Sequence, residues 1–357
     1  MGKEYTREKA AVMAEAALGH TEIRHPSTAA DIKDSTGLIL GIAFCLVYVI
    51  AIRALAPLLE PVAFAPDSGF AHYLWKLPDP TAWSRTTAWG GYILHQAAIW
   101  ACIAYAQEKG LKYQNKLHPV NIAALGLNAL FVALHLAQTH TFYDGTAQDT
   151  HITTSQGSVI VMLVMILIME NRRRGLAFGA KAPISENVVS AMRKYHGYVF
   201  SWAVIYTFWY HPMESTGGHL LGTLYTTLIM VQGSLMFTRI HLNKWWTGFL
   251  EFWVVIHGTT VALIAGNGSW AQFMFGFLAM FIVTQMHGFG FSKALRWAFA
   301  ACYVGGVAVT YAFVRPLSGS HEILRVPAVE YALVFIFAIF TWGLLALVAP
   351  KPKRSAA

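Results

Sequence analysis

The chain contains ten runs of mostly apolar residues, each separated from the next by a short polar segment. A helix that crosses a bilayer needs about 20 mostly apolar residues, and the runs approach or reach that length. The pattern therefore predicts an all-α, polytopic integral membrane bundle with about ten transmembrane helices. The runs cover residues 38–58, 88–106, 119–138, 155–170, 195–210, 219–237, 248–266, 270–288, 296–314 and 329–349.

The composition agrees with a membrane protein. Of the 357 residues, 56% are hydrophobic and only 12% are charged, whereas a soluble domain carries about a quarter charged residues. We expect a single transmembrane domain at 37–349, between a polar cytoplasmic tail at 1–36 and a basic cytoplasmic tail at 350–357. The first tail mixes basic and acidic residues and has no apolar core, so it is not expected to be a secretory signal peptide.

Lysine and arginine are distributed unequally between the two sides of the membrane that the ten predicted crossings define. If the N-terminus is cytoplasmic, 21 of the 26 basic residues fall in cytoplasmic segments and four in external ones. Because cytoplasmic loops accumulate Lys and Arg, both termini are predicted in the cytoplasm, as in a protein of the bacterial inner membrane. The basic residues lie in short loops rather than in one patch, which favours membrane lipids over nucleic acid as partners.

Two external loops, 139–154 and 211–218, carry imidazoles and carboxylates but no Lys or Arg. Neutral imidazole and carboxylate are the usual ligands of Fe, Zn, Mn and Cu. The loops therefore predict a transition-metal site, with iron favoured over zinc or copper. Its expected ligands are His135, His140, His211 and His219. Asp144 or Glu214 is expected to act as a further ligand or as a base.

Ionisable residues inside the apolar runs are further candidates, because a charge there costs about 2.5–3.5 kcal/mol on insertion scales. His257 lies near the middle of the seventh run and is expected to be a deep catalytic contact. Glu251, on the same run, is expected to pair with Arg239.

Haem held between histidines of facing helices is an alternative cofactor. The candidate haem-binding residues are His95, His196 and His211. His196 and His211 stand 15 residues apart on one run, which separates them by roughly 22 Å along a helix. Each would therefore need a partner histidine on another helix.

The longest external connection, residues 59–87, is rich in proline and contains Trp75 and Trp83. A connection of this length without predicted secondary structure is often functional. It is expected to lie along the membrane surface or to cover the mouth of a cavity.

These patterns predict an integral-membrane enzyme that oxidises or hydroxylates an apolar or lipid-like substrate near the non-cytoplasmic face, with a metal and a redox partner protein. Three alternatives stay open: a proton-coupled secondary transporter, a haem-binding redox protein, and a metal-free enzyme that transfers a group between lipids. In the last case His140 with Asp144, or His211 with Glu214, would be the general base pair.

Overall fold

Helix is the only regular secondary structure in the part of the chain that the computed structural model describes, residues 35–69, 72–266 and 268–348. Ten long helices make up most of it: α2 (Thr36–Leu55), α3 (Ala82–Glu108), α4 (Pro119–Phe142), α5 (Ile152–Arg174), α6 (Glu186–Tyr210), α7 (Gly217–Ser234), α8 (Lys244–Ala265), α9 (Trp270–Val283), α10 (Lys293–Val309) and α11 (Arg325–Val348). Short helical turns join them: η2 (Ala56–Leu58), η3 (Thr146–Gln148), η4 (Ile240–Leu242), η5 (Gln285–Gly288), η6 (Thr310–Val314) and η7 (Leu317–Leu324). The predicted tail 1–36 falls almost entirely outside the described residues, and the tail 350–357 lies wholly outside them.

Each of the ten apolar runs overlaps one long helix, so the all-α prediction is confirmed. The helix ends differ from the predicted ones, because polar residues extend several helices beyond their apolar run. The short run at 155–170 belongs to the 23-residue helix α5, and the run that starts at 195 belongs to a helix that starts at Glu186. The run at 270–288 is divided instead, since α9 ends at Val283 and η5 follows.

Six of the described helices are long and apolar enough to cross a membrane. They are Thr36–Leu58, Pro119–Phe142, Ile152–Arg174, Lys244–Ala265, Lys293–Val314 and Leu317–Val348. Large apolar side chains cover the outside of several of them, including Phe313 and Leu347, each 84% exposed. Because a folded protein in water does not leave apolar surface of this extent uncovered, these helices indicate an integral membrane protein.

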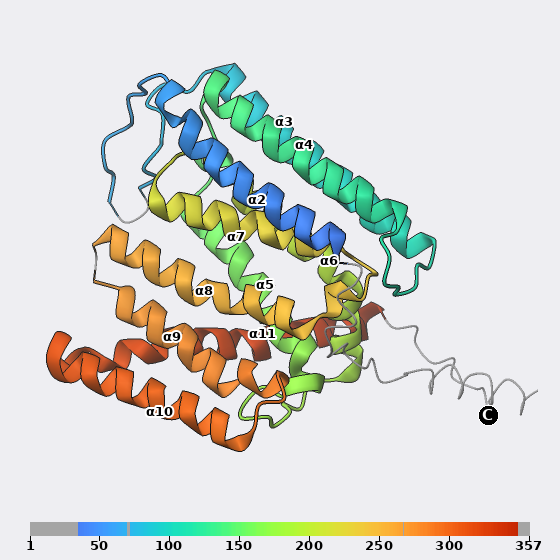
Figure 1. Cartoon of the computed structure of the whole chain (residues 1–357), viewed down its shortest axis with the longest axis vertical. Coiled ribbons are helices and arrows are strands. Elements are labelled where there is room, and N and C mark those ends of the chain that lie inside the picture. Colours follow the sequence, from blue (N-terminus) through green and yellow to red (C-terminus); the bar gives the residue numbers. More distant parts are fainter. Residues whose placement is uncertain (1–34, 70–71, 267, 349–357) are drawn as a thin grey trace, which may run out of the picture.

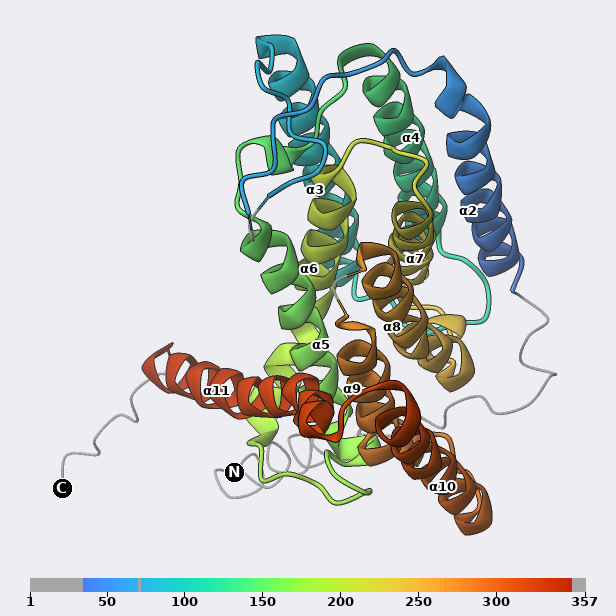
Figure 2. The ribbon, with the colours of Figure 1, turned by 90° about the vertical axis from the view of Figure 1, so that its left-hand side faces the viewer.

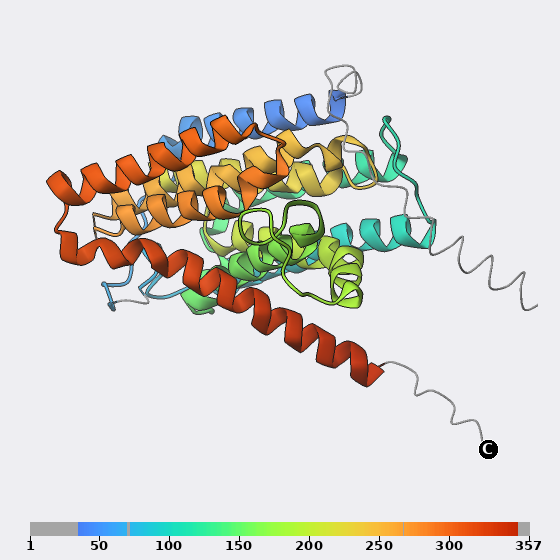
Figure 3. The ribbon, with the colours of Figure 1, turned by 90° about the horizontal axis from the view of Figure 1, so that it is seen from below.

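The helices lie side by side, with α2, α3 and α4 at one end of the molecule and α9, α10 and α11 at the other (Figure 1). Helices α6 and α7 occupy the centre, since α6 packs against α3, α5 and α7, and α7 packs against α2, α4 and α8. Figure 2 shows α10 at the edge, where it packs against α9 and buries none of its own residues. Toward its C-terminal end, α11 diverges from the other helices (Figure 3).

Local sequence signals fix several helix starts and ends. Asn243 caps α8, because its side-chain oxygen accepts hydrogen bonds from the backbone N–H groups of Trp245 and Trp246. Thr81 caps α3 by accepting from the Ser84 N–H. Helix α4 ends differently, with Tyr143 in the left-handed region at φ 44°. A non-glycine residue there is uncommon and often belongs to a functional site.

Candidate functional site

Three segments far apart in the sequence meet at one end of the bundle: the loop after α4, the loop after α6, and the connection between η2 and α3. The loop after α4 is pressed against the end of α6, since a Cβ at Gly145 would collide with the Tyr210 carbonyl oxygen. The connection is tied to the same loop by two hydrogen bonds. The Leu77 N–H donates to Gln148 Oε1 (2.9 Å), and Gln148 Nε2 donates to the Leu77 carbonyl (3.0 Å).

At this junction the rings of His211 and His219 lie beside each other, with centroids 5.6 Å apart. Trp75 packs edge-on against both, with its ring centroid 5.3 Å from each imidazole. Tyr73 stacks on His211 at 5.4 Å. The proline-rich connection thus packs against two histidines through Tyr73 and Trp75.

Two carboxylates complete this group. The Tyr143 hydroxyl donates a hydrogen bond to the Glu214 carboxylate, and its ring packs against Phe64. Asp144 is 2% exposed, and its Oδ1 accepts from the Gly145 N–H (2.8 Å). We call Tyr73, Trp75, Tyr143, Asp144, His211, Glu214 and His219 the histidine–aromatic cluster.

The cluster contains buried polar atoms that have no hydrogen-bond partner among the described residues. They are Tyr73 Oη, Asp144 Oδ2 and His211 Nδ1, and the nearby Thr146 Oγ1 is a fourth. A buried polar group without a partner costs roughly 1–3 kcal/mol, so several in one place are not expected unless something else binds there. Donor and acceptor atoms are both present, so a polar group of a ligand or a water can satisfy several of them at once.

Burial sets the protonation of these groups. It raises the pKa of Asp144, although the Gly145 N–H, Ser84 and Arg85 act in the opposite direction. It also raises the pKa of Tyr73 well above its usual range, and the nearby Tyr143, Asp144, Tyr210 and Glu214 act in the same direction. Burial together with the neighbouring His135 lowers the pKa of His211 to about 3, so this imidazole is neutral at physiological pH.

The predicted four-histidine ligand set is not brought together. His211 and His219 are neighbours, but both ring nitrogens of His135 face protein groups: Nε2 donates to the His211 carbonyl (2.8 Å), and Nδ1, which is then the unprotonated nitrogen, faces the side-chain amide of Gln138 (3.0 Å). His140 lies against the end of α2, with Nδ1 2.9 Å from the Leu136 carbonyl oxygen and Nε2 3.2 Å from the Leu55 carbonyl oxygen, and the nitrogen that carries the hydrogen donates to its carbonyl. Within the described ranges, no group of three or more His, Cys, Asp or Glu side chains is arranged to hold a metal ion.

A third carboxylate near the cluster, Asp149, is already paired within the fold. Its carboxylate pairs with Arg85 at the start of α3 (2.7 Å) and accepts a hydrogen bond from Trp89 Nε1 (3.1 Å). The loop itself contains no basic residue, but the neighbouring helix supplies one. Asp144 and Glu214 have no such basic partner among the described ion pairs.

The three haem candidates lie in separate environments. His95 is fully buried, with Nε2 bonded to Asn128 Oδ1 (2.8 Å) and Nδ1 accepting from Trp209 Nε1 (3.2 Å), so both nitrogens are engaged. His196 bonds the Arg193 carbonyl through Nδ1 (2.7 Å), and its ring centroid is 6.2 Å from that of His241. His211 belongs to the histidine–aromatic cluster.

His257 lies deeper, on α8. A Cβ at Gly222 of α7 would lie 2.8 Å from His257 Nε2, so this glycine allows the imidazole to pack directly against α7. His219 stands one turn before Gly222 and is close enough to His257 for their charges to interact. His257 therefore borders the cluster, on the side that leads into the bundle.

A second polar group, inside the bundle, was missed by the sequence reasoning. Glu251 pairs with Arg174 at the end of α5 (2.6 Å), and the expected pairing with Arg239 is wrong. Glu330 on α11 shares a cavity with this pair. Its signal in the sequence was a carboxylate within the last apolar run, where an ionisable residue is costly and usually functional.

No family model, curated protein or solved structure matches the chain. The function must therefore be inferred from the geometry of these two groups.

Proposed function

We propose that the chain is an integral-membrane enzyme that transfers a group to or from the polar end of a lipid-like or apolar substrate, and that the histidine–aromatic cluster is its active site. The observation that carries the proposal is the set of unpartnered buried atoms at Tyr73, Asp144 and His211. Aromatic side chains surround them, and a mostly apolar lining with a few polar groups is typical of sites for small molecules.

The surroundings of the two acids suggest their roles. Asp144, whose pKa is raised by burial, is assigned as the proton donor. Glu214, which accepts the Tyr143 hydroxyl, is assigned as the proton acceptor. The neutral imidazoles of His211 and His219 bind and orient the polar end of the substrate, and Trp75 covers them. His257 is a more distant contact on the inner side.

A comparison of lipid extracts tests this function. A strain that lacks the gene is complemented with the wild-type chain, with His219→Gln or with His140→Gln, a control that changes a histidine outside the cluster. The proposal expects one lipid class to change in the deletion strain and to be restored by wild type and His140→Gln but not by His219→Gln. Unchanged lipids, or restoration by all three, would reject it.

The second candidate is metal-assisted oxidation or hydroxylation with iron, and one observation favours it. His211 is a neutral imidazole with an unpartnered nitrogen beside the His219 ring, and neutral imidazole is the form that binds metals. Asp144 or Glu214 would have to supply further ligands. Metal analysis of the purified protein separates the candidates: stoichiometric metal that is lost in His211→Ala supports this one, and its absence supports group transfer.

We also infer that all ten long helices cross the bilayer and that both ends of the chain are cytoplasmic, in the inner membrane of a bacterium. The sorting of Lys and Arg supports this, as does Figure 1, in which the start of α2 and the end of α11 lie at the same side. Labelling of single cysteines placed in the loops at 139–154 and 109–116 tests the topology. Labelling of both loops from the same side would contradict it.

A further inference from the structure

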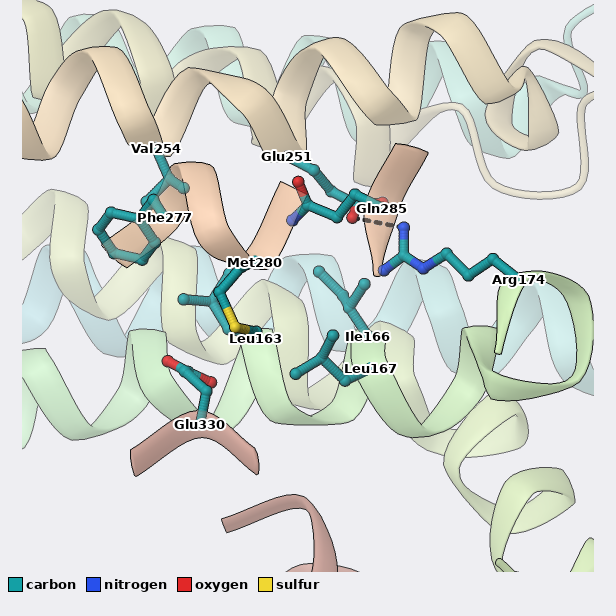
Figure 4. A pocket seen from close by; sticks show the side chains of 10 residues that line it. All are labelled: Leu163, Ile166, Leu167, Arg174, Glu251, Val254, Phe277, Met280, Gln285 and Glu330. Carbon is teal, nitrogen blue, oxygen red and sulfur yellow. Dashed lines mark hydrogen bonds and ion pairs between the residues drawn. The ribbon is translucent and has the colours of Figure 1, made fainter. Parts of the chain in front are cut away.

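A small cavity lies inside the bundle, between α5, α8, α9, η5 and α11 (Figure 4). Most of its lining is apolar, but four polar side chains reach it: Arg174, Glu251, Gln285 and Glu330. The centre of a water molecule can occupy about 20 Å³ of it, which is room for at least one water. The cavity is thus a small, mostly apolar space that four polar side chains reach.

Arg174 and Glu251 form a buried ion pair on one side of this space. Their side chains are 2% and 10% exposed, and the Arg174 Nη1 to Glu251 Oε2 distance is 2.6 Å. The guanidinium keeps two buried nitrogens, Nε and Nη2, without a partner among the described residues. Arg174 therefore has hydrogen-bond donors that remain available to the cavity.

Glu330 is the third ionisable side chain that lines the cavity. It is 5% exposed, and its Oε2 has no partner among the described residues. Because Arg174 is already neutralised by Glu251, an ionised Glu330 would leave a net charge of minus one, and an uncompensated buried charge costs several kcal/mol. A cation must therefore accompany the Glu330 carboxylate, or a proton must neutralise it.

The cavity is suited to a proton rather than to a metal cation. Hard cations take about six or more oxygen ligands, whereas only Glu251, Gln285 and Glu330 offer side-chain oxygens here. A proton needs a single carboxylate oxygen and a water to receive it. The space for a water next to the free Arg174 donors meets that need.

We propose that Glu330 is a proton-binding site inside the membrane, and that it exchanges its proton with water in the cavity that it lines. On release, the O–H bond of Glu330 breaks and the proton passes to the water. The carboxylate that is left lines the cavity and faces its water. The net charge of the three side chains changes from zero to minus one, and it returns to zero on rebinding.

Glu330 is the acid at this cavity that can exchange a proton, because the groups around it are paired or do not titrate. Arg174 from α5 and Glu251 from α8 are already paired with each other. From α9 and η5, the polar lining is Gln285, which does not titrate. Tyr331, the next residue on α11, shares a hydrogen bond with Thr284 (2.7 Å).

Protonation of Glu330 has a structural consequence for α11. The buried residues of this helix are Glu330, Val334 and Ala338, spaced four apart and so on one face. Glu330 thus belongs to the stripe by which α11 packs against the bundle. A charge introduced there weakens the packing of α11.

Infrared difference spectroscopy of the full-length protein in lipid vesicles tests the proposal. A pH titration of the wild type is expected to show the C=O stretching band of a protonated carboxylic acid, which disappears at high pH and shifts in D2O. Glu330→Gln, which has the shape of the protonated acid and is expected to fold, should lose this band. The matched control Glu108→Gln removes an exposed carboxylate and should keep it.

Two further measurements keep the test decisive. Glu330→Asp should retain a titrating band at a shifted frequency. This variant assigns the band to residue 330 even if Glu330→Gln does not fold. The hydrogen-exchange protection factors of α11, which are corrected for the pH dependence of intrinsic exchange, should fall at high pH in the wild type and stay constant in Glu330→Gln. A titrating band that is identical in the wild type and both Glu330 variants, or no titrating band in the wild type, would overturn the proposal.

Discussion

Removal of one partner from the Arg174–Glu251 pair should destabilise the protein more than removal of both. The pair is almost fully buried, and its distance of 2.6 Å leaves no room for water between the charged atoms. Arg174→Met leaves the Glu251 carboxylate buried without its partner, and Glu251→Gln does the same to the Arg174 guanidinium. Each single change is expected to cost about 3–5 kcal/mol, because breaking a buried pair leaves an uncompensated charge.

The double variant Arg174→Met/Glu251→Gln removes both charges and should cost less than either single variant. If its cost is at most about 3 kcal/mol, the two single costs exceed the double cost by about 3 kcal/mol or more, which is the interaction energy of the pair. The expected sign of this interaction energy follows from the burial of both groups. It does not depend on how strongly the charges attract each other.

The assay is unfolding of the purified protein in mixed micelles by increasing SDS, followed by far-ultraviolet circular dichroism. The matched control is the surface pair Arg172–Glu186, which is 3.1 Å apart with side chains 40% and 65% exposed. Its interaction energy should be about 0–1 kcal/mol. Additive single costs at Arg174 and Glu251, or an interaction energy no larger than that of the control, would refute the reasoning.

Three other outcomes are expected. With a chelator present, lowering the pH from 7 to 5 should destabilise the wild type by about 2 kcal/mol more than His211→Asn, because the pKa of His211 is lowered to about 3 in the fold and is about 6.5 in the unfolded chain, so that only the unfolded state takes up this proton as the pH falls; unfolding curves of both proteins check this, and equal pH dependence would contradict it. Gly91→Ala should cost about 1–3 kcal/mol, because the new Cβ collides with the Trp209 indole. Gly90→Ala, where nothing lies within 4 Å, should be neutral or stabilising by up to about 1 kcal/mol, and a similar effect of both changes on the unfolding midpoint would show that the contact is absent.

The helices could be predicted from the sequence because the apolar runs are a local and strong signal. Their ends could not, because capping side chains such as Asn243 and the left-handed Tyr143 decide where a helix starts or stops. An apolar run also says nothing about the polar turn that continues it, as at Glu186, where α6 begins before its apolar residues.

The candidate site was only partly predictable, since its contacts join segments far apart in the chain. The two basic-free loops indicated His211 and His219, which do lie together. Sequence spacing could not show that His135 uses both nitrogens within the fold, or that Trp75 covers the pair. These details depend on which helices become neighbours, and no local pattern encodes that.

The same limit explains the missed ion pair. Arg174 and Glu251 are 77 residues apart, and a basic residue close along the chain, such as Arg239, is a poor guide to the partner when helices from distant segments pack together. Glu330 was recognisable as an acid within an apolar run. Its relation to Arg174 required the packing of α11 against α5.

An experimental map of the protein purified with its native lipids tests the central claim most directly. If the histidine–aromatic cluster is an active site, density for a bound molecule or an ordered group should lie within hydrogen-bond distance of His211 Nδ1 and Asp144 Oδ2. The claim would be contradicted by a map in which His211 Nδ1 and Asp144 Oδ2 both bond to protein groups and protein side chains fill the space beneath Trp75.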